Sequence, residues 1–166
     1  MNTPEVTWSG IGFLFVLLLR GFLVLSEFSL VNLRYSDVSE AALAQLRKRG
    51  NIAYLLDNLK RAGEIIRIGR KICSLATGGF LFLLIYSLFQ NKHVWIAMVL
   101  AVVLGVLVQV LLSDLIPRFL AGLNPQKALG TGAWAIFVFW IIGWPFLKIQ
   151  DYLRGPLKKW TNQESG

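Results

Sequence analysis

Four apolar segments dominate the chain, and each is long enough to cross a membrane as a helix. They cover residues 10–33, 72–89, 94–112 and 129–147. An α-helix rises about 1.5 Å per residue, so roughly 20 apolar residues span a hydrocarbon core of about 30 Å. With 55% hydrophobic residues, the chain is predicted to be an all-α membrane protein. The first segment has no basic residue before it and no small-residue cleavage pattern, so we expect it to remain as a span.

The charge balance of the chain is strongly basic. Seventeen Lys and Arg residues stand against nine Asp and Glu residues, which gives a net charge of +8. On so apolar a chain, this excess indicates cytoplasmic loops beside anionic lipid headgroups rather than a nucleic-acid partner. Cys73 and His93 are the only cysteine and histidine, so neither a disulfide nor a histidine cluster can form within the chain. No nucleophile and base stand out as a pair, and we expect no enzyme.

The distribution of Lys and Arg among the connectors predicts the topology. Residues 34–71 contain nine of them, whereas residues 90–93 contain only Lys92. By the positive-inside rule the first connector is cytoplasmic and the amino terminus lies outside. The third segment then returns to the cytoplasm, where Arg118 and Lys127 follow it. We expect a plasma membrane or another cellular membrane, with the carboxy terminus cytoplasmic.

The first connector also has an apolar side. Two short amphipathic helices are predicted in it, over residues 41–46 and 52–60, with Gly50-Asn51 ending the first. Such helices would lie at the inner membrane surface.

The fourth apolar segment is less suited to spanning than the others. If it crossed, Lys148 and the basic residues after it would lie outside, against the positive-inside rule. It also contains Gly143 and Pro145, which predict a break, and Trp residues that favour the headgroup region. A helix lying in the inner interface resolves the conflict. We therefore favour three spans and an interfacial helix over four spans.

Charged residues inside apolar segments are candidate functional residues, because each costs about 2.5–3.5 kcal/mol to insert. Arg20 and Glu27 lie seven positions apart in the first segment and hence on one helix face. Ser26 and Ser29 are polar neighbours of Glu27. The simpler interpretation is a seam of hydrogen bonds between helices.

A second candidate lies at the end of the third segment. Asp114 follows Ser113 and precedes Pro117 by three positions. Pro117 removes a backbone donor and frees a carbonyl about one turn earlier, which predicts a helix kink. A carboxylate, a hydroxyl and a free carbonyl are hard oxygen ligands of the kind that Mg²⁺ and Ca²⁺ prefer. A helix end at the interface would give the same pattern.

Three motifs in this order resemble the transmembrane domain of the cyclin-M/CorB/CorC magnesium transporters. They are SEFSLVNLR at residues 26–34, Ile68-Gly69 followed by Ser74, and SDLIPR at residues 113–118 followed by NPQKA at 124–128. The similarity extends from roughly residue 10 to 154. The third motif is the most specific and the second the weakest. The sequence contains no segment like the paired nucleotide-binding regulatory domains that usually follow this domain in the family.

The resemblance implies a fold of three transmembrane helices, a pair of short cytoplasmic-side helices and an interfacial juxtamembrane belt helix. Residues 1–154 would form this domain and residues 155–166 a polar cytoplasmic tail. It also implies a homodimer, or a subunit of a larger membrane complex, in a lipid bilayer. A dehydrated Mg²⁺ would be bound by Asp114, Ser26 and Ser74, with Glu27, Ser29 and Ser113 as further candidates.

The chain departs from the family pattern at the expected ion site. Val24 stands where the family has a hydroxyl, and Arg70 and Ser74 stand where its best-known members have Asn. Losing an oxygen ligand matters because Mg²⁺ needs a nearly complete octahedral shell, and Arg70 with Lys71 would repel a divalent cation. Two functions remain open: divalent-cation transport of the CorC type with a partly degenerate ion site, or a transport-inactive structural or assembly subunit.

Overall fold

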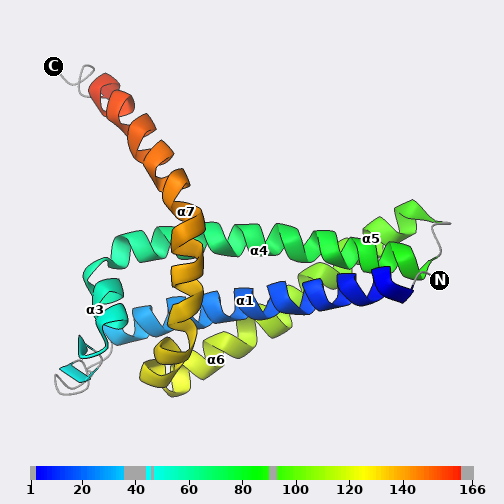
Figure 1. Ribbon diagram of the computed structural model, residues 1–166, viewed down its shortest axis with the longest axis horizontal. Coiled ribbons are helices and arrows are strands. Elements are labelled where there is room, and N and C mark those ends of the chain that lie inside the picture. Colours follow the sequence, from blue (N-terminus) through cyan, green and yellow to red (C-terminus); the bar gives the residue numbers. More distant parts are fainter. Residues whose placement is uncertain (1–2, 36–43, 46, 90–92, 162–166) are drawn as a thin grey trace.

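A computed structural model describes residues 3–35, 44–45, 47–89 and 93–161 of the chain, and every regular element in these ranges is helical. The long helices α1 (Thr3–Tyr35) and α4 (Leu59–Leu88) lie side by side (Figure 1). A third long helix, Val94–Leu123, runs along them. It consists of α5 (Val94–Val108), the π-helix η1 (Gln109–Leu115) and α6 (Ile116–Leu123). These three rods form a bundle with α1 in contact with both others.

The last helix, α7 (Pro125–Thr161), has a different direction. In Figure 1 it crosses α1 and α4 steeply and continues beyond the bundle. It contacts both of these helices and α3 (Gly50–Asp57), which lies at the end of the bundle opposite the amino terminus. By length and composition the described residues contain four helices able to cross a membrane, and α7 is one of them.

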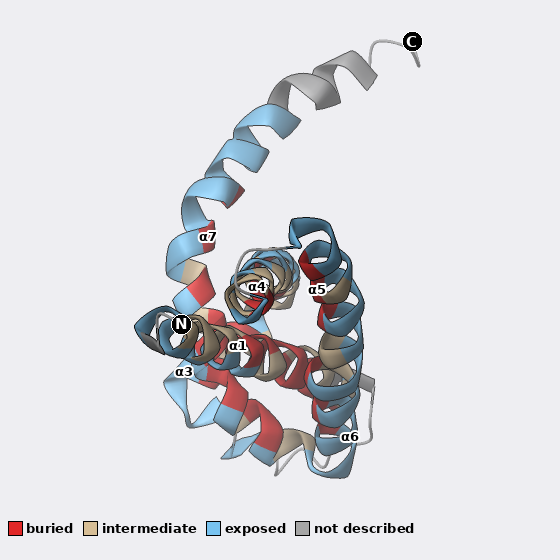
Figure 2. Ribbon diagram, turned by 90° about the vertical axis from the view of Figure 1, so that its right-hand side faces the viewer, coloured by how far each residue is buried: buried red, intermediate tan, exposed pale blue. Residues whose placement is uncertain are grey.

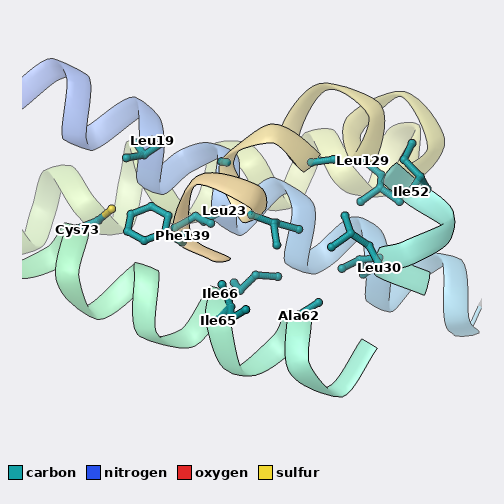
Figure 3. Packing of buried hydrophobic residues seen from close by; sticks show 14 of the residues in the cluster. Leu19, Leu23, Leu30, Ile52, Ala62, Ile65, Ile66, Cys73, Leu129 and Phe139 are labelled. Carbon is teal, nitrogen blue, oxygen red and sulfur yellow. The ribbon is translucent and has the colours of Figure 1, made fainter. Parts of the chain in front are cut away.

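The main core lies where α1, α3, α4 and α7 meet (Figure 3). Fully buried apolar residues come from each of these helices: Leu23, Leu55, Ile65, Ile66, Leu129 and Ile136. Burial of a Leu or Ile side chain contributes about 1.5–3 kcal/mol in water, and inside a bilayer close packing takes over that role. This core therefore fixes α7 against the three-rod bundle.

The outward surface of the bundle is apolar. Figure 2 shows that the outer side of α5 is exposed along most of its length. The exposed residues there include Val99, Val102, Val103 and Val106. A helix that is apolar on all sides is characteristic of a membrane segment. The surface is therefore suited to contact with lipid, which confirms the prediction of an all-α membrane protein.

The first connector agrees with the prediction in part, because the short helix expected over residues 52–60 is present as α3. Gly50 begins α3 instead of ending a helix, and residues 59–71 belong to α4, which continues without interruption into the apolar segment. The reason is an apolar stripe on one helical face, formed by the buried residues Ala62, Ile65, Ile66 and Gly69. Of the charged residues between them, Arg67 is exposed and Glu64 is half-buried. Most of the other predicted short helix, over residues 41–46, falls outside the described residues.

The expected break in the fourth segment is also wrong, because α7 is continuous through Gly143 and Pro145. A proline removes one backbone hydrogen bond, and its neighbours keep theirs; membrane helices commonly tolerate this.

Candidate functional site

Arg20 lies at the centre of a polar network between the three rods. Arg20 is buried, with 7% of the residue's surface exposed. From Nη2 it donates hydrogen bonds to both carboxylate oxygens of Asp114, at 3.1 Å to Oδ1 and 3.3 Å to Oδ2. From Nη1 it donates to Oε1 of Gln109. The guanidinium on α1 therefore connects two side chains of η1.

The π-helix explains why one arginine reaches both acceptors. Gln109 and Asp114 are five positions apart within the same π-helical stretch. In a regular α-helix five positions turn through about 140°, which would direct the two side chains to different sides. In a π-helix, hydrogen bonds join residues five positions apart, so these residues share a face. The irregular turn thus creates the acceptor pair.

Pro117 provides a local reason for the π-helix. It is buried and lies at the start of α6, directly after η1. It has no backbone N–H, and its ring would clash with the carbonyl four positions earlier in a regular α-helix, which is that of Ser113. Widening of the preceding turn relieves this conflict. Where the sequence predicted a helix kink, the structure has a change of helix type directly before α6.

Arg70 of α4 extends the network toward the carboxy-terminal end of α1. Its Nη1 is 2.6 Å from Glu27 Oε2, and its Nη2 is 3.9 Å from Asp114 Oδ1. One turn along α4, the Ser74 hydroxyl donates to Gln109 Oε1 at 2.7 Å, and Gln109 Nε2 donates to the Ser74 carbonyl at 3.2 Å. Each of the three rods is thereby joined to the other two by polar side chains.

The charges of this network balance. Two guanidinium groups, of Arg20 and Arg70, face two carboxylates, of Asp114 and Glu27. Charged groups at such depth persist when they are paired and hydrogen-bonded. Among the described residues there is no group of three or more His, Cys, Asp or Glu that could hold a metal ion. The network is therefore an internally neutral cluster in which arginines occupy the places beside the carboxylates.

Three of the predicted site residues join this network: Glu27, Ser74 and Asp114. Ser26 and Ser29 do not, because each hydroxyl donates to the carbonyl four positions earlier on α1, Phe22 at 2.9 Å and Leu25 at 2.6 Å. Both serines are fully buried. Their hydroxyls thus satisfy the polarity of α1 itself.

Ser26 has a packing role at the crossing of α1 and α7. Gly132 of α7 lies against it so closely that a Cβ at this position would be 2.9 Å from the Phe22 carbonyl oxygen. Small residues let membrane helices approach each other in this way. The serine and the glycine together set the distance between α1 and α7.

Ser113, although adjacent to Asp114, faces a different partner. Its hydroxyl is buried and donates to the Leu17 carbonyl of α1 at 3.3 Å. It therefore joins α1 to η1 one turn away from Arg20. Like the hydroxyls of Ser26 and Ser29, it donates to a backbone carbonyl.

Gln109 is the site residue that the sequence reasoning missed. It accepts hydrogen bonds from both Arg20 and Ser74. The available signal was a lone amide within an otherwise apolar span, since polar side chains at such positions usually bond another helix.

Comparison with known families places this geometry in context. Residues 11–163 match the family model of the cyclin M transmembrane N-terminal domain, CNNM. The chain belongs to the CNNM family. The resemblance stated from the three motifs is therefore confirmed, and with it a multi-pass membrane protein of a divalent-cation transporter family. A search of curated proteins found no match.

Proposed function

We propose that this CNNM-family protein carries no divalent cation through its own polar centre and serves as a structural or assembly subunit of a membrane complex. The observation that supports this most strongly is the pairing of the carboxylates. Asp114 is bonded to Arg20 and also lies near Arg70, and Glu27 is paired with Arg70. The oxygen atoms that could hold a cation are thus engaged by the protein's own cations.

Electrostatic magnitudes favour this proposal. A divalent cation 4 Å from a guanidinium is repelled by about 8 kcal/mol at an effective dielectric constant of 20. Mg²⁺ at Asp114 would face Arg20 at such a distance unless the arginine moved. Moving it would break a buried ion pair, which costs about 3–5 kcal/mol when one charge is left unpaired. The repulsion and the loss of the ion pair both disfavour binding of a divalent cation at Asp114.

Ion flux into sealed vesicles tests the proposal. The purified protein is reconstituted with a Mg²⁺-sensitive dye inside, and a divalent-cation ionophore serves as the control that the dye responds. We expect the dye signal to rise no faster than in protein-free vesicles. A faster rise that Asp114→Ala abolishes would overturn the proposal.

Mg²⁺ transport is the second candidate, supported by membership in the CNNM family. Its site would use Asp114, Glu27 and Ser74, the predicted residues that share the network. Arg20 and Arg70 would then have to withdraw during each transport cycle. Under this alternative Arg20→Gln should raise the flux, while Arg20→Lys, which keeps the positive charge, should not.

We also propose three spans, with α7 as a belt at the inner membrane surface. The steep crossing of α7 over α1 and α4 supports this (Figure 1). If the three rods lie along the bilayer normal, α7 is steeply inclined to that normal. Trp144 and Lys148 support it further. Both are exposed, and the Lys148 ammonium lies 3.8 Å from the Trp144 ring centroid. Such residues favour the headgroup level. The amino terminus would lie outside and the carboxy terminus in the cytoplasm.

Assembly is the remaining part of the proposal. A homodimer or a larger complex is expected, and native mass spectrometry of protein extracted in mild detergent measures it directly. A fixed stoichiometry with itself or with one partner would agree with the subunit role. A uniform monomer would contradict it.

A further inference from the structure

A basic cavity opens beside the polar network, on the side of α4. Its volume is about 520 Å³, and its lining residues are Arg20, Arg67, Arg70, Lys71, Ser74 and Leu75. Most of the lining is therefore cationic. A cavity for a metal cation would have the opposite character, because cations are bound by oxygen ligands and negative charge.

The carboxylates of the network neutralise only part of this charge. Arg20 and Arg70 have Asp114 and Glu27 as partners. For Arg67 and Lys71, no carboxylate within the described part of the chain lies at ion-pair distance. Both are exposed on α4. The cavity therefore keeps an excess of two positive charges, with donors that suit a phosphate group.

The surroundings of the cavity are apolar on one side. Leu75 lines it and is 80% exposed, and Ile72, on the next turn toward the basic residues, is also exposed. Arg67 and Lys71 stand directly before the apolar part of α4, which begins at Ile72. Charged residues at this boundary meet the lipid headgroups. A ligand here would have its phosphate beside the basic residues and a hydrocarbon chain along Leu75.

We propose that this cavity binds the headgroup of an anionic phospholipid. Arg67 and Lys71 supply the unpaired positive charge, and the exposed apolar surface next to them receives the acyl chain. A free phosphate would be attracted by the same charges, but it has no hydrocarbon part that could contact the apolar side. The proposal is independent of whether the polar centre transports ions, because Arg67 and Lys71 belong to none of the ion pairs described above.

Lipid retention measured by native mass spectrometry tests the proposal. The protein is equilibrated with equal amounts of phosphatidylglycerol and phosphatidylcholine in mild detergent. The test variant is Arg67→Gln with Lys71→Gln. The matched control is Lys60→Gln with Arg61→Gln, an exposed basic pair at the start of α4 that does not line the cavity. We expect wild type and control to prefer phosphatidylglycerol, and the test variant to bind it about tenfold more weakly.

Three results would overturn the proposal. One is equal retention of the two lipids by the wild type. Another is an equal loss in both variants, which would indicate general attraction of basic residues to anionic lipid. The third is inorganic phosphate binding to lipid-free protein as tightly as phosphatidylglycerol, which would make a soluble phosphate the ligand. Thermal unfolding of both variants should match the wild type, since all four substituted side chains are exposed.

Discussion

The guanidinium of Arg20 on α1 forms an ion pair with Asp114 on η1, with 3.1 Å between Nη2 and Oδ1 and side-chain exposures of 8% and 18%. Within a membrane bundle, a pair this deep determines how two helices rotate against each other, because either charge alone would be costly. Gln109 completes the arrangement as an uncharged acceptor. The resulting cluster holds the three rods together and leaves little negative charge for a cation.

Removal of one member of this pair should destabilise the protein strongly. Asp114→Ala leaves Arg20 buried and without its carboxylate, and we expect a loss of about 3–5 kcal/mol in unfolding free energy. Arg20→Met combined with Asp114→Leu should lose less than Asp114→Ala, because no charge remains unpaired. Helicity during titration with sodium dodecyl sulfate measures both. Equal losses would show that charge pairing is not the cause.

The Glu27–Arg70 pair should contribute less. Its side chains are 33% and 26% exposed, so water and salt screen it more than the inner pair. We expect Glu27→Gln to lower the unfolding free energy by about 1 kcal/mol or less. The same titration compares it with Asp114→Ala. A Glu27→Gln loss as large as that of Asp114→Ala would contradict this ranking of the two pairs.

Gln109→Leu should be destabilising although leucine is more apolar. The substitution removes an acceptor from the buried Arg20 guanidinium and from the half-buried Ser74 hydroxyl, and a buried donor left unpaired costs about 1–3 kcal/mol. Val110→Leu is the matched control, because Val110 is the exposed neighbour on the same π-helix. We expect the control to be neutral. A neutral Gln109→Leu would mean that water or another side chain replaces the amide.

Gly132→Ala tests the close contact of α7 with α1. A Cβ there would lie 2.9 Å from the Phe22 carbonyl oxygen and still closer to Ser26, so the helices must separate, at about 1–3 kcal/mol. At Gly122 of α6 a Cβ would meet nothing within 4 Å. Gly122→Ala should therefore be neutral or stabilise by about 0.5–1 kcal/mol. Thermal unfolding in detergent distinguishes them, and an equal effect of the two substitutions would refute the contact.

Cysteine labelling tests the proposed orientation. In a Cys73→Ser background, His93→Cys and Lys60→Cys each place one thiol at an exposed position. A membrane-impermeant maleimide applied to intact cells should label His93→Cys directly. It should label Lys60→Cys only after permeabilisation. The reverse pattern would invert the topology.

Much of the helical architecture could be predicted from periodicity and length. The apolar runs fixed the number of long helices, and the motif with Pro117 indicated where the third helix becomes irregular. The connector was misread because its charged residues concealed the stripe formed by Ala62, Ile65 and Ile66. That stripe is a sequence signal of α4, and the 3–4-residue spacing of its members would have revealed it.

The candidate site was predictable only in part. Asp114 and Glu27 stood out as charged residues in or at the end of apolar segments, and Ser74 followed from the family resemblance; the three do share a network. Ser26 and Ser29 look the same in sequence, yet their hydroxyls bond their own helix. A hydroxyl in a helix can donate backward to its own backbone or across to a neighbour. Which acceptor the hydroxyl takes depends on how the helix is rotated relative to its neighbours, and the local sequence pattern carries no information about that rotation.

The sequence alone determined that this protein is a helical membrane protein with a strongly basic first connector, because apolar length and charge placement act locally along the chain. The tertiary structure decided which charges meet. Arg20 and Asp114 are 94 positions apart, and their pairing depends on a bundle packed by Leu23, Ile65 and Ile136 and on the π-helical turn before Pro117. The energy of an electrostatic interaction depends on the distance between the charges in space and not on their separation in sequence. For that reason only the fold could show a carboxylate suited to a cation already bonded to an arginine.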